Sequence, residues 1–177
     1  GELGYDMNVR PSQQHVLWQA LMATGTPVGM RPIGMRAQDS LRLEKGYGVW
    51  SLEFSTTCTP AMAGLERFVA ADKGDFIGRE AFLAARETGP EMSLVLLQVE
   101  SPDADATGYE PIHHHDQRIG YVTSGAYGHH VQQSLALAYV DTGWCEATDP
   151  LSVTILGKPR AARILRSPPY DPTGSKL

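Results

Sequence analysis

The sequence has no long apolar run: nowhere in its 177 residues do as many as about eighteen apolar side chains follow one another. A helix needs about 20 consecutive apolar residues to cross a bilayer, so we expect no membrane-spanning helix. An excess of positive charge is also lacking. Fifteen Lys and Arg stand against 20 Asp and Glu, for a net charge of −5, so we expect no nucleic-acid partner.

Cysteine is scarce. Cys58 and Cys145 lie far apart in the sequence and form neither a metal-binding box nor a disulfide framework. A chain with so few cysteines suits a reducing compartment, and we expect the cytoplasm or the mitochondrial matrix. The hydrophobic content of 42% is that of an ordinary globular protein, and the length allows one domain or two small ones.

Six histidines raise the question of a metal site. His113, His114 and His115 are consecutive, and consecutive strand residues point to opposite faces, so all three cannot close on one ion. We expect a hairpin turn there. His129 and His130 have no Cys, Asp or Glu at ligand spacing. The sequence therefore predicts no metal site.

The most informative segment is residues 34–47, Gly-Met-Arg-Ala-Gln-Asp-Ser-Leu-Arg-Leu-Glu-Lys-Gly-Tyr. At 100° per residue, a helix here would carry Met35 and Leu43 roughly opposite Leu41, so we expect burial on two sides. Asp39 and Arg42 share a sector with Met35 and Leu43. Charges in such a place form an internal pair three residues apart or meet a polar ligand, and the spacing leaves both open.

Other patterns place the remaining elements of the first half. Alternating apolar residues predict a strand over Tyr5–Val9, and Ser12 can cap a helix that reaches Thr24 and stops at Gly25. We further expect an extended segment at Tyr47–Phe54 and a short helix after Pro60. A strand is expected at Leu65–Ala70, and a further helix at Arg79–Glu87.

The pattern changes at Gly89-Pro90, after which only strands are predicted. We therefore expect an α+β part over residues 1–90 and an all-β barrel over residues 91–177. The predicted strands are Ser93–Val99, a hairpin from Pro111 to Val122 that turns at His115-Asp116, Leu135–Val140, and a hairpin from Leu151 to Leu165 that turns at Gly157-Lys158-Pro159.

Several motifs, in fixed order, resemble the glycine-cleavage T-protein (aminomethyltransferase) superfamily. Residues 34–46 resemble its G-x-x-A-x-x-S-L-R-x-E-K-G segment, and residues 59–65 and 72–81 resemble T-P-x-x-A-G-L and K-G-D-F-I-G-R-E-A. Gln38 stands where the T-protein usually has Arg, and the variants look most like the folate-domain end of dimethylglycine and sarcosine dehydrogenases. Further matches are Gly1–Asp6 with G-E-x-G-Y-E, and Gly108–Ile112, Gly120–His129 and Ser134–Val140 with the family's C-terminal barrel.

The resemblance implies a tetrahydrofolate-dependent one-carbon enzyme. Its cofactor-binding residues here would be Glu2, Tyr5 and Arg42: Glu2 accepting two N–H groups of the pterin, Tyr5 walling the pocket, and Arg42 shaping the site or pairing with Asp39. The resemblance also places the key Asp before Gly1, so we expect no catalytic residue in this chain and interpret it as a fragment of a longer enzyme, inactive alone.

In such an enzyme a separate FAD domain oxidises a small N-methyl amine, and tetrahydrofolate captures the one-carbon unit. The segment Gly74–Gly78 lacks the G-x-G-x-x-G pattern, so these residues encode no FAD or NAD site. Two alternatives stay open: a non-catalytic module of the same fold that serves packing or partner binding, and a folate-dependent methyltransferase or demethylase with another methyl donor.

Overall fold

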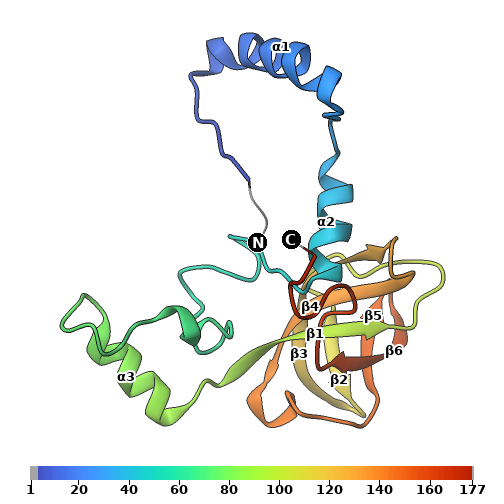
Figure 1. Cartoon of the computed structure of the whole chain (residues 1–177). Coiled ribbons are helices and arrows are strands. Elements are labelled where there is room, and N and C mark those ends of the chain that lie inside the picture. The colour runs from blue at the N-terminus through green and yellow to red at the C-terminus, as the bar shows by residue number, and fades with distance from the viewer. Residues whose placement is uncertain (1–3, 177) are drawn as a thin grey trace.

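The C-terminal half of the protein is a closed barrel of six antiparallel strands (Figure 1), seen in a computed structural model that describes residues 4–176. The strands follow one another around the barrel in the order β1-β4-β3-β2-β5-β6, and β6 pairs with β1 to close it. Closure leaves no free sheet edge. The strands are β1 Met92–Val99, β2 Pro111–His114, β3 Gln117–Gly128, β4 Gln133–Asp141, β5 Leu151–Ile155 and β6 Lys158–Leu165.

The interior of the barrel holds the main hydrophobic core. Alternate residues point inward, as Leu151, Val153 and Ile155 do on β5, where each is at most 2% exposed. Fourteen buried side chains form this cluster, so the strand half contains a complete core of its own. The all-β barrel expected from the sequence is confirmed, and it has six strands.

Two hairpins turn through left-handed residues. His115 has a φ of 51° in the turn between β2 and β3, as expected for His115-Asp116. Leu156 and Gly157, with φ of 49° and 76°, form the two-residue turn between β5 and β6. The prediction of a turn at residues 157–159 was one residue late, because the turn needs two left-handed residues and these are Leu156 and Gly157.

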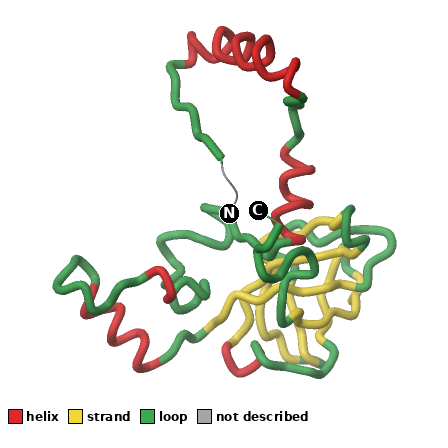
Figure 2. Tube along the Cα trace, in the orientation of Figure 1, coloured by secondary structure: helices red, strands yellow, loops and turns green. Residues whose placement is uncertain are grey.

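The N-terminal half is helical and open (Figure 2). Helix α1, Gln14–Gly25, lies far from the barrel, α2, Met35–Glu44, runs down to it, and α3, Arg79–Thr88, lies to one side. Neither α1 nor α3 has a buried residue. The 3₁₀ turns are η1 Pro11–Gln13, η2 Thr26–Val28, η3 Glu66–Phe68 and η4 Thr142–Trp144. No helix among residues 4–176 is long and apolar enough to cross a membrane.

Several expectations for the first half were wrong. Residues 5–9 form no strand, Leu65–Ala70 contains η3, and the segment after Pro60 forms turns instead of a helix. Tyr47–Phe54 folds into turns joined by one bridge between Trp50 and Phe54. Apolar residues recur in these segments, but a strand exists only where a second strand accepts its hydrogen bonds, and within residues 4–176 no strand pairs with them.

The ends of α1 also differ from the expectation. Ser12 lies in η1 and the residue before the helix is Gln13, which makes no side-chain capping bond. Gly25 is the last helical residue, and the chain continues into η2 before Gly29 turns it with a φ of 89°. The bounds of α3 agree with the sequence, and Gly78 and Gly89, with φ of 89° and 73°, flank it as expected.

Helix α2 forms a second layer over the outside of the barrel. Leu43 is fully buried against Leu96, Leu135 and Leu137, which point outward from β1 and β4. The expectation of burial on two sides was wrong, because only the C-terminal turns of α2 touch the barrel and Met35 stays 82% exposed. Gly46, with a φ of 65°, follows the helix as predicted.

Candidate functional site

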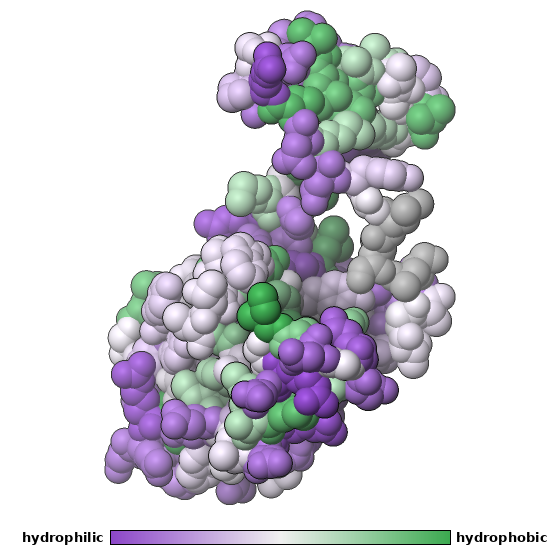
Figure 3. Space-filling view, turned by 90° about the vertical axis from the view of Figure 1, so that its left-hand side faces the viewer, coloured by the Kyte–Doolittle hydropathy of each residue, from purple (hydrophilic) through white to green (hydrophobic). Residues whose placement is uncertain are grey.

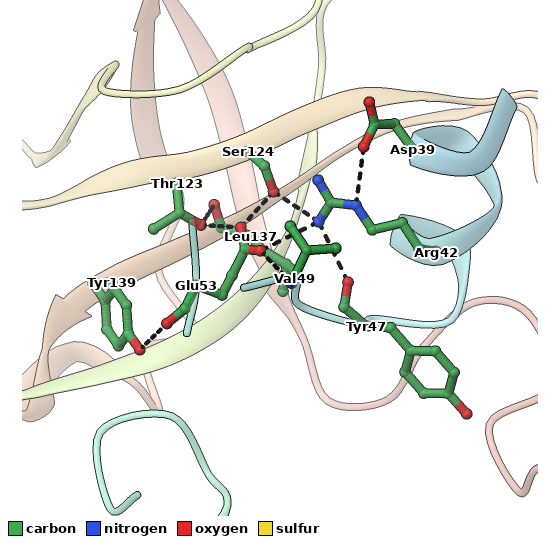
Figure 4. A network of polar contacts seen from close by, with 9 residues as sticks. All are labelled: Asp39, Arg42, Tyr47, Val49, Glu53, Thr123, Ser124, Leu137 and Tyr139. Carbon is green, nitrogen blue, oxygen red and sulfur yellow. Dashed lines mark hydrogen bonds and ion pairs between the residues drawn. The ribbon is translucent and has the colours of Figure 1, made fainter. Parts of the chain in front are cut away.

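A buried carboxylate lies where α2 meets the barrel. Glu53 is fully buried, and the loop of residues 47–54 curls around it so that the backbone N–H of Val49 donates to its Oε2 at 2.9 Å (Figure 4). The curl brings Gly48 close to the side chain of Glu53. A side chain at position 48 would place its Cβ 2.8 Å from the Cβ of Glu53. Only glycine therefore fits at position 48 without a shift of the loop.

Two hydroxyls of β3 bind the other oxygen of this carboxylate. Thr123 and Ser124 donate to Oε1 of Glu53 at 2.6 and 2.5 Å. Neighbouring strand residues normally point to opposite faces, but the pairing of β3 with β4 shifts register between Val122 and Ser124. This bulge is the reason that two consecutive hydroxyls reach one carboxylate.

Arg42 completes the network from α2. Its Nη1 donates to the hydroxyl of Ser124 at 2.9 Å and to the carbonyl oxygen of Tyr47 at 3.3 Å, and lies 3.4 Å from Oε2 of Glu53. Its Nε donates to Asp39 at 3.2 Å. The remaining nitrogen, Nη2, has no hydrogen-bond partner within residues 4–176 (Figure 4). The guanidinium is thus fixed from two sides with one N–H₂ group uncommitted.

Tyr139 extends the network toward Cys58. The Tyr139 hydroxyl donates to the carbonyl oxygen of Glu53 at 2.8 Å, and burial is the main cause that raises the pKa of this phenol. Burial also raises the pKa of the Cys58 thiol, but hydrogen bonds with the hydroxyls of Tyr139, Ser55 and Thr57 outweigh it and leave that pKa below its ordinary value. The network therefore joins α2, the 47–54 loop, β3 and β4.

A second set of hydrogen bonds ties α2 to the loop that follows β3. Ser40 donates to the carbonyl oxygen of Tyr127 at 2.9 Å and accepts from the N–H of His129 at 3.1 Å. Glu44, 1% exposed, accepts from the N–H of His130 at 2.8 Å. These contacts fix the backbone of the loop at His129 and His130, while the two residues stay exposed.

The C-terminal tail covers the end of α2. Lys45 and Asp171 form an ion pair of 3.0 Å, with side chains 8% and 1% exposed. Burial raises the pKa of Asp171, but the hydrogen bond from Lys45 and the N–H groups of Lys176 and Ser175 outweigh it and lower that pKa to about 2. Asp171 therefore stays ionised at neutral pH and attaches the tail to the helix.

Of the residues predicted to bind a cofactor, the structure describes Tyr5 and Arg42 and shows no contact between them. Glu2 lies outside the described residues. Tyr5 is 79% exposed in the segment before α1, and no hydrogen bond or ring contact joins it to Arg42 within residues 4–176. Arg42 is 9% exposed and pairs with Asp39, as the spacing allowed, but it also contacts Glu53 and Ser124, which no local pattern places beside it.

Sequence reasoning missed Glu53, Thr123, Ser124 and Tyr139. One signal was present: Arg42 shares a helical sector with Leu43, and a buried guanidinium calls for more than one acceptor. Which acceptors they are follows from the 47–54 loop and the β3 bulge, and neither has a local pattern. Within residues 4–176, no three His, Cys, Asp or Glu side chains gather closely enough to hold a metal ion.

The geometry defines a class of protein: an open N-terminal half with three helices, whose helix α2 is fixed by buried polar contacts to a closed six-stranded barrel. Comparison with known proteins gives the family. A sequence profile described as "GCVT N-terminal domain" matches residues 1–73, and one described as "Glycine cleavage T-protein C-terminal barrel domain" matches residues 93–171. The chain belongs to the glycine-cleavage T-protein, or aminomethyltransferase, superfamily, as the sequence motifs predicted.

Relatives of two kinds are similar along nearly the whole chain. Human mitochondrial dimethylglycine dehydrogenase is 36% identical over all of this chain and 21% of its own length. The aminomethyltransferase of Desulforamulus reducens is 33% identical over 96% of this chain and 46% of its own length. The crystal structure of the glycine cleavage system aminomethyltransferase T from Bartonella henselae superposes with a TM-score of 0.74 at 27% identity, over 89% of this chain and 44% of that one.

Proposed function

We propose that this chain forms the barrel-bearing portion of a tetrahydrofolate-dependent one-carbon enzyme of the aminomethyltransferase or dimethylglycine dehydrogenase type. The observation that carries the proposal is the similarity of the whole chain to both kinds of enzyme, with the N-terminal and barrel profiles in the same order. The chain spans less than half of the length of these relatives, so the activity belongs to an assembly larger than these residues.

The reaction that we propose is oxidative N-demethylation. A flavin held outside these residues would supply the oxidation of a small N-methyl amine, and tetrahydrofolate, which Glu2, Tyr5 and Arg42 would hold in this chain, would accept the one-carbon unit as 5,10-methylene-tetrahydrofolate. One of these relatives is a mitochondrial enzyme and the other is bacterial, and we place the proposed enzyme in the mitochondrial matrix or the bacterial cytoplasm. The role of this chain is to complete the folate pocket, and we assign it no catalytic residue.

The residues that we propose to bind folate combine hydrogen-bonding and charged groups with an apolar surface. Glu2 accepts the paired N–H groups of the aminopyrimidine, and the ring of Tyr5 supplies an apolar wall. Arg42 offers its uncommitted Nη2 to a folate carboxylate, while its other nitrogens hold the guanidinium still. A guanidinium fixed in advance loses little freedom on binding, which favours the ligand.

One variant tests the folate proposal. In a fusion that joins the rest of the Desulforamulus reducens aminomethyltransferase to residue 1, Glu2→Gln puts a donor opposite a donor of the pterin. The loss costs roughly 1.5–3 kcal/mol, or about tenfold to more than a hundredfold in affinity. Calorimetric titration with folinic acid measures it, and Glu66→Gln, a change on the exposed side of η3, is the control.

An unchanged affinity in the Glu2→Gln fusion would contradict the folate site. It would favour a non-catalytic module, a role for which the polar contacts of the last turns of α2 with the barrel and the 47–54 loop are the specific observation. A second measurement concerns the isolated chain. With dimethylglycine or sarcosine, tetrahydrofolate and an electron acceptor, it should form no methylene-tetrahydrofolate, and turnover above background would contradict our assignment of catalysis to other residues.

A further inference from the structure

Two buried side-chain nitrogens of the barrel lack a hydrogen-bond partner. Hydrophobic surface gathers over α1, at the end of the molecule away from the barrel (Figure 3), whereas these polar atoms lie in the opposite half. They are Nε2 of His114 on β2 and Nε of Arg160 on β6, and no other buried side-chain nitrogen or oxygen within residues 4–176 is without a partner. Buried polar groups are nearly always paired, so these two nitrogens call for an acceptor from outside the described chain.

Both nitrogens belong to residues that line one cavity. This cavity, of about 640 Å³, lies where the end of β2, the start of β5 and the middle of β6 come together. Strand β5 pairs with both neighbours, since Ser152 lies opposite His113 on β2 and Ala161 on β6. The volume is that of an ordinary small-molecule site, so it has room for more than a single ion.

Asp103 fixes the guanidinium of Arg160. Nη2 of Arg160 donates to Oδ1 of Asp103 in the loop after β1, and this hydrogen bond is the main cause that holds the pKa of Asp103 below its ordinary value. An arginine grips a carboxylate best with two parallel N–H groups, and side-on these are Nε and Nη2. Because Asp103 occupies Nη2, Arg160 has only the single N–H of Nε left on this side.

Aromatic contacts fix the ring of His114. Its centroid lies 4.1 Å from that of the Trp144 ring and 4.3 Å from that of the His115 ring. Nε2 of His114 lies 3.8 Å from Oδ2 of Asp149, which is too long for a hydrogen bond. A third donor lies in the lining, because the hydroxyl of Ser152 makes no side-chain hydrogen bond within the described residues. The cavity therefore has three uncommitted donors, one from each of three strands.

This donor set favours a tetrahedral oxyanion. A carboxylate is planar and gains most from two parallel bonds to one arginine, which Asp103 prevents at Arg160. A phosphate group has three strong acceptor oxygens that point in different directions, so single donors from separate strands can each reach one of them. The remaining walls would contact the body of a phosphate ester. They are formed by Pro150, Leu151, Pro159 and Ala161.

We propose that this cavity binds a phosphate group, whose oxygens accept hydrogen bonds from Arg160, His114 and Ser152. The side chains of Arg160 and His114 are 16% and 14% exposed and their free nitrogens are covered, so both side chains rotate slightly to meet the anion. His114 donates from Nε2 when that nitrogen carries the proton. Asp149, 77% exposed beside His114, opposes the anion by its charge. The proposal does not depend on folate.

Calorimetric titration of the chain with phenyl phosphate, at constant ionic strength, tests this proposal. We expect saturable binding at one site and an affinity lower by about tenfold or more in Arg160→Gln, because a charge-assisted hydrogen bond is lost. Arg163→Gln is the matched control. Arg163 lies on the same strand but donates to Gln98 and is exposed, so its loss should change the affinity by less than about twofold. In two-dimensional NMR spectra, the amide signals of His115 and Ser152 should shift on titration.

A change of opposite sign separates binding from folding. Asp149→Asn removes a negative charge at an exposed position, so it should tighten phenyl phosphate binding by about threefold or more. Inorganic phosphate bound as tightly as phenyl phosphate would support the site with free phosphate as its ligand, and weaker binding would support it with an ester. Three results would overturn the proposal: no saturable binding, equal affinities in Arg160→Gln and Arg163→Gln, or benzoate bound as tightly as phenyl phosphate.

Discussion

The barrel and residues 4–34, which we call the arm, differ in the contacts that hold them together. In the barrel, every strand is paired on both sides and fourteen buried side chains share one core. In the arm, a helix of twelve residues buries no side chain. A helix of this length is marginal in water without tertiary packing. Hydrophobic sequence is present in both regions, so the difference lies in whether the chain itself provides a second apolar surface.

Helix α2 lies between these two regions and combines their properties. Its first turn is exposed like α1, as Met35 shows, and its last turns are as buried as the barrel, as Leu43 shows. The change occurs where Ser40, Arg42 and Glu44 meet β3 and the loop after it. The polar network therefore marks the point at which the barrel begins to support the N-terminal half.

The largest expected effect tests that junction. Glu53→Ala leaves the buried guanidinium of Arg42 without its fully buried partner and leaves the hydroxyls of Thr123 and Ser124 without their acceptor. Loss of one partner of a buried pair costs about 3–5 kcal/mol of unfolding free energy. Urea denaturation measures it. Glu66→Ala, at an exposed site, should cost less than about 0.5 kcal/mol.

A double variant separates the ionic pair from simple packing. Arg42→Met together with Glu53→Gln removes both charges, so it should destabilise less than the sum of the two single changes. If the two effects add fully, Arg42 and Glu53 do not interact and our description of the junction is wrong.

Two matched truncations compare the barrel with the arm. Leu97→Ala, at a fully buried position on β1, should cost about 2–5 kcal/mol through lost burial and a cavity. Leu21→Ala on α1 should cost less than about 1 kcal/mol, because that side chain stays partly exposed and Ala favours helix. Comparable losses of unfolding free energy in the two variants would mean that the arm contributes to the same core as the barrel.

The smallest effect concerns the acid stability of the tail. The pKa of Asp171 is lowered to about 2, below the usual value near 3.9 of an unfolded chain. A carboxyl with a depressed pKa stabilises the fold fully above pH 4 and loses this contribution as the pH falls from about 4 to about 2. Asp171→Asn should lower stability at pH 7 and flatten this acid limb, as melting temperatures measured from pH 7 to 2 can show. An unchanged slope would contradict the role of the Lys45 pair.

The sequence predicted the barrel well and the N-terminal half poorly, for a physical reason. Strands such as β1 and the hairpin turn at His115 follow from alternation and turn residues, and their partners lie within the chain. Residues 5–9 have the same alternation, but no other strand within residues 4–176 pairs with them. They therefore form no strand there. The division near residue 90 follows the change from helices to strands, and its use as a folding boundary stays a prediction.

The candidate site was predictable only in part. The pair of Asp39 and Arg42 follows from helical spacing, and the structure contains it. Glu53 and Ser124 reach Arg42 from 11 and 82 residues away, through a curled loop and a bulge that depend on tertiary contacts. Single-sequence reasoning has no access to contacts of that separation.

Limited proteolysis tests most directly the claim that the barrel is self-supporting and the arm is not. Chymotrypsin can cleave after Trp18 in the arm and after Tyr127 on β3, and both side chains are exposed, so backbone stability is the main difference between the two sites. Mass spectrometry of a digestion time course should show cleavage after Trp18 at least roughly a hundredfold faster than after Tyr127. Equal rates at the two sites in the monomeric chain would contradict this account.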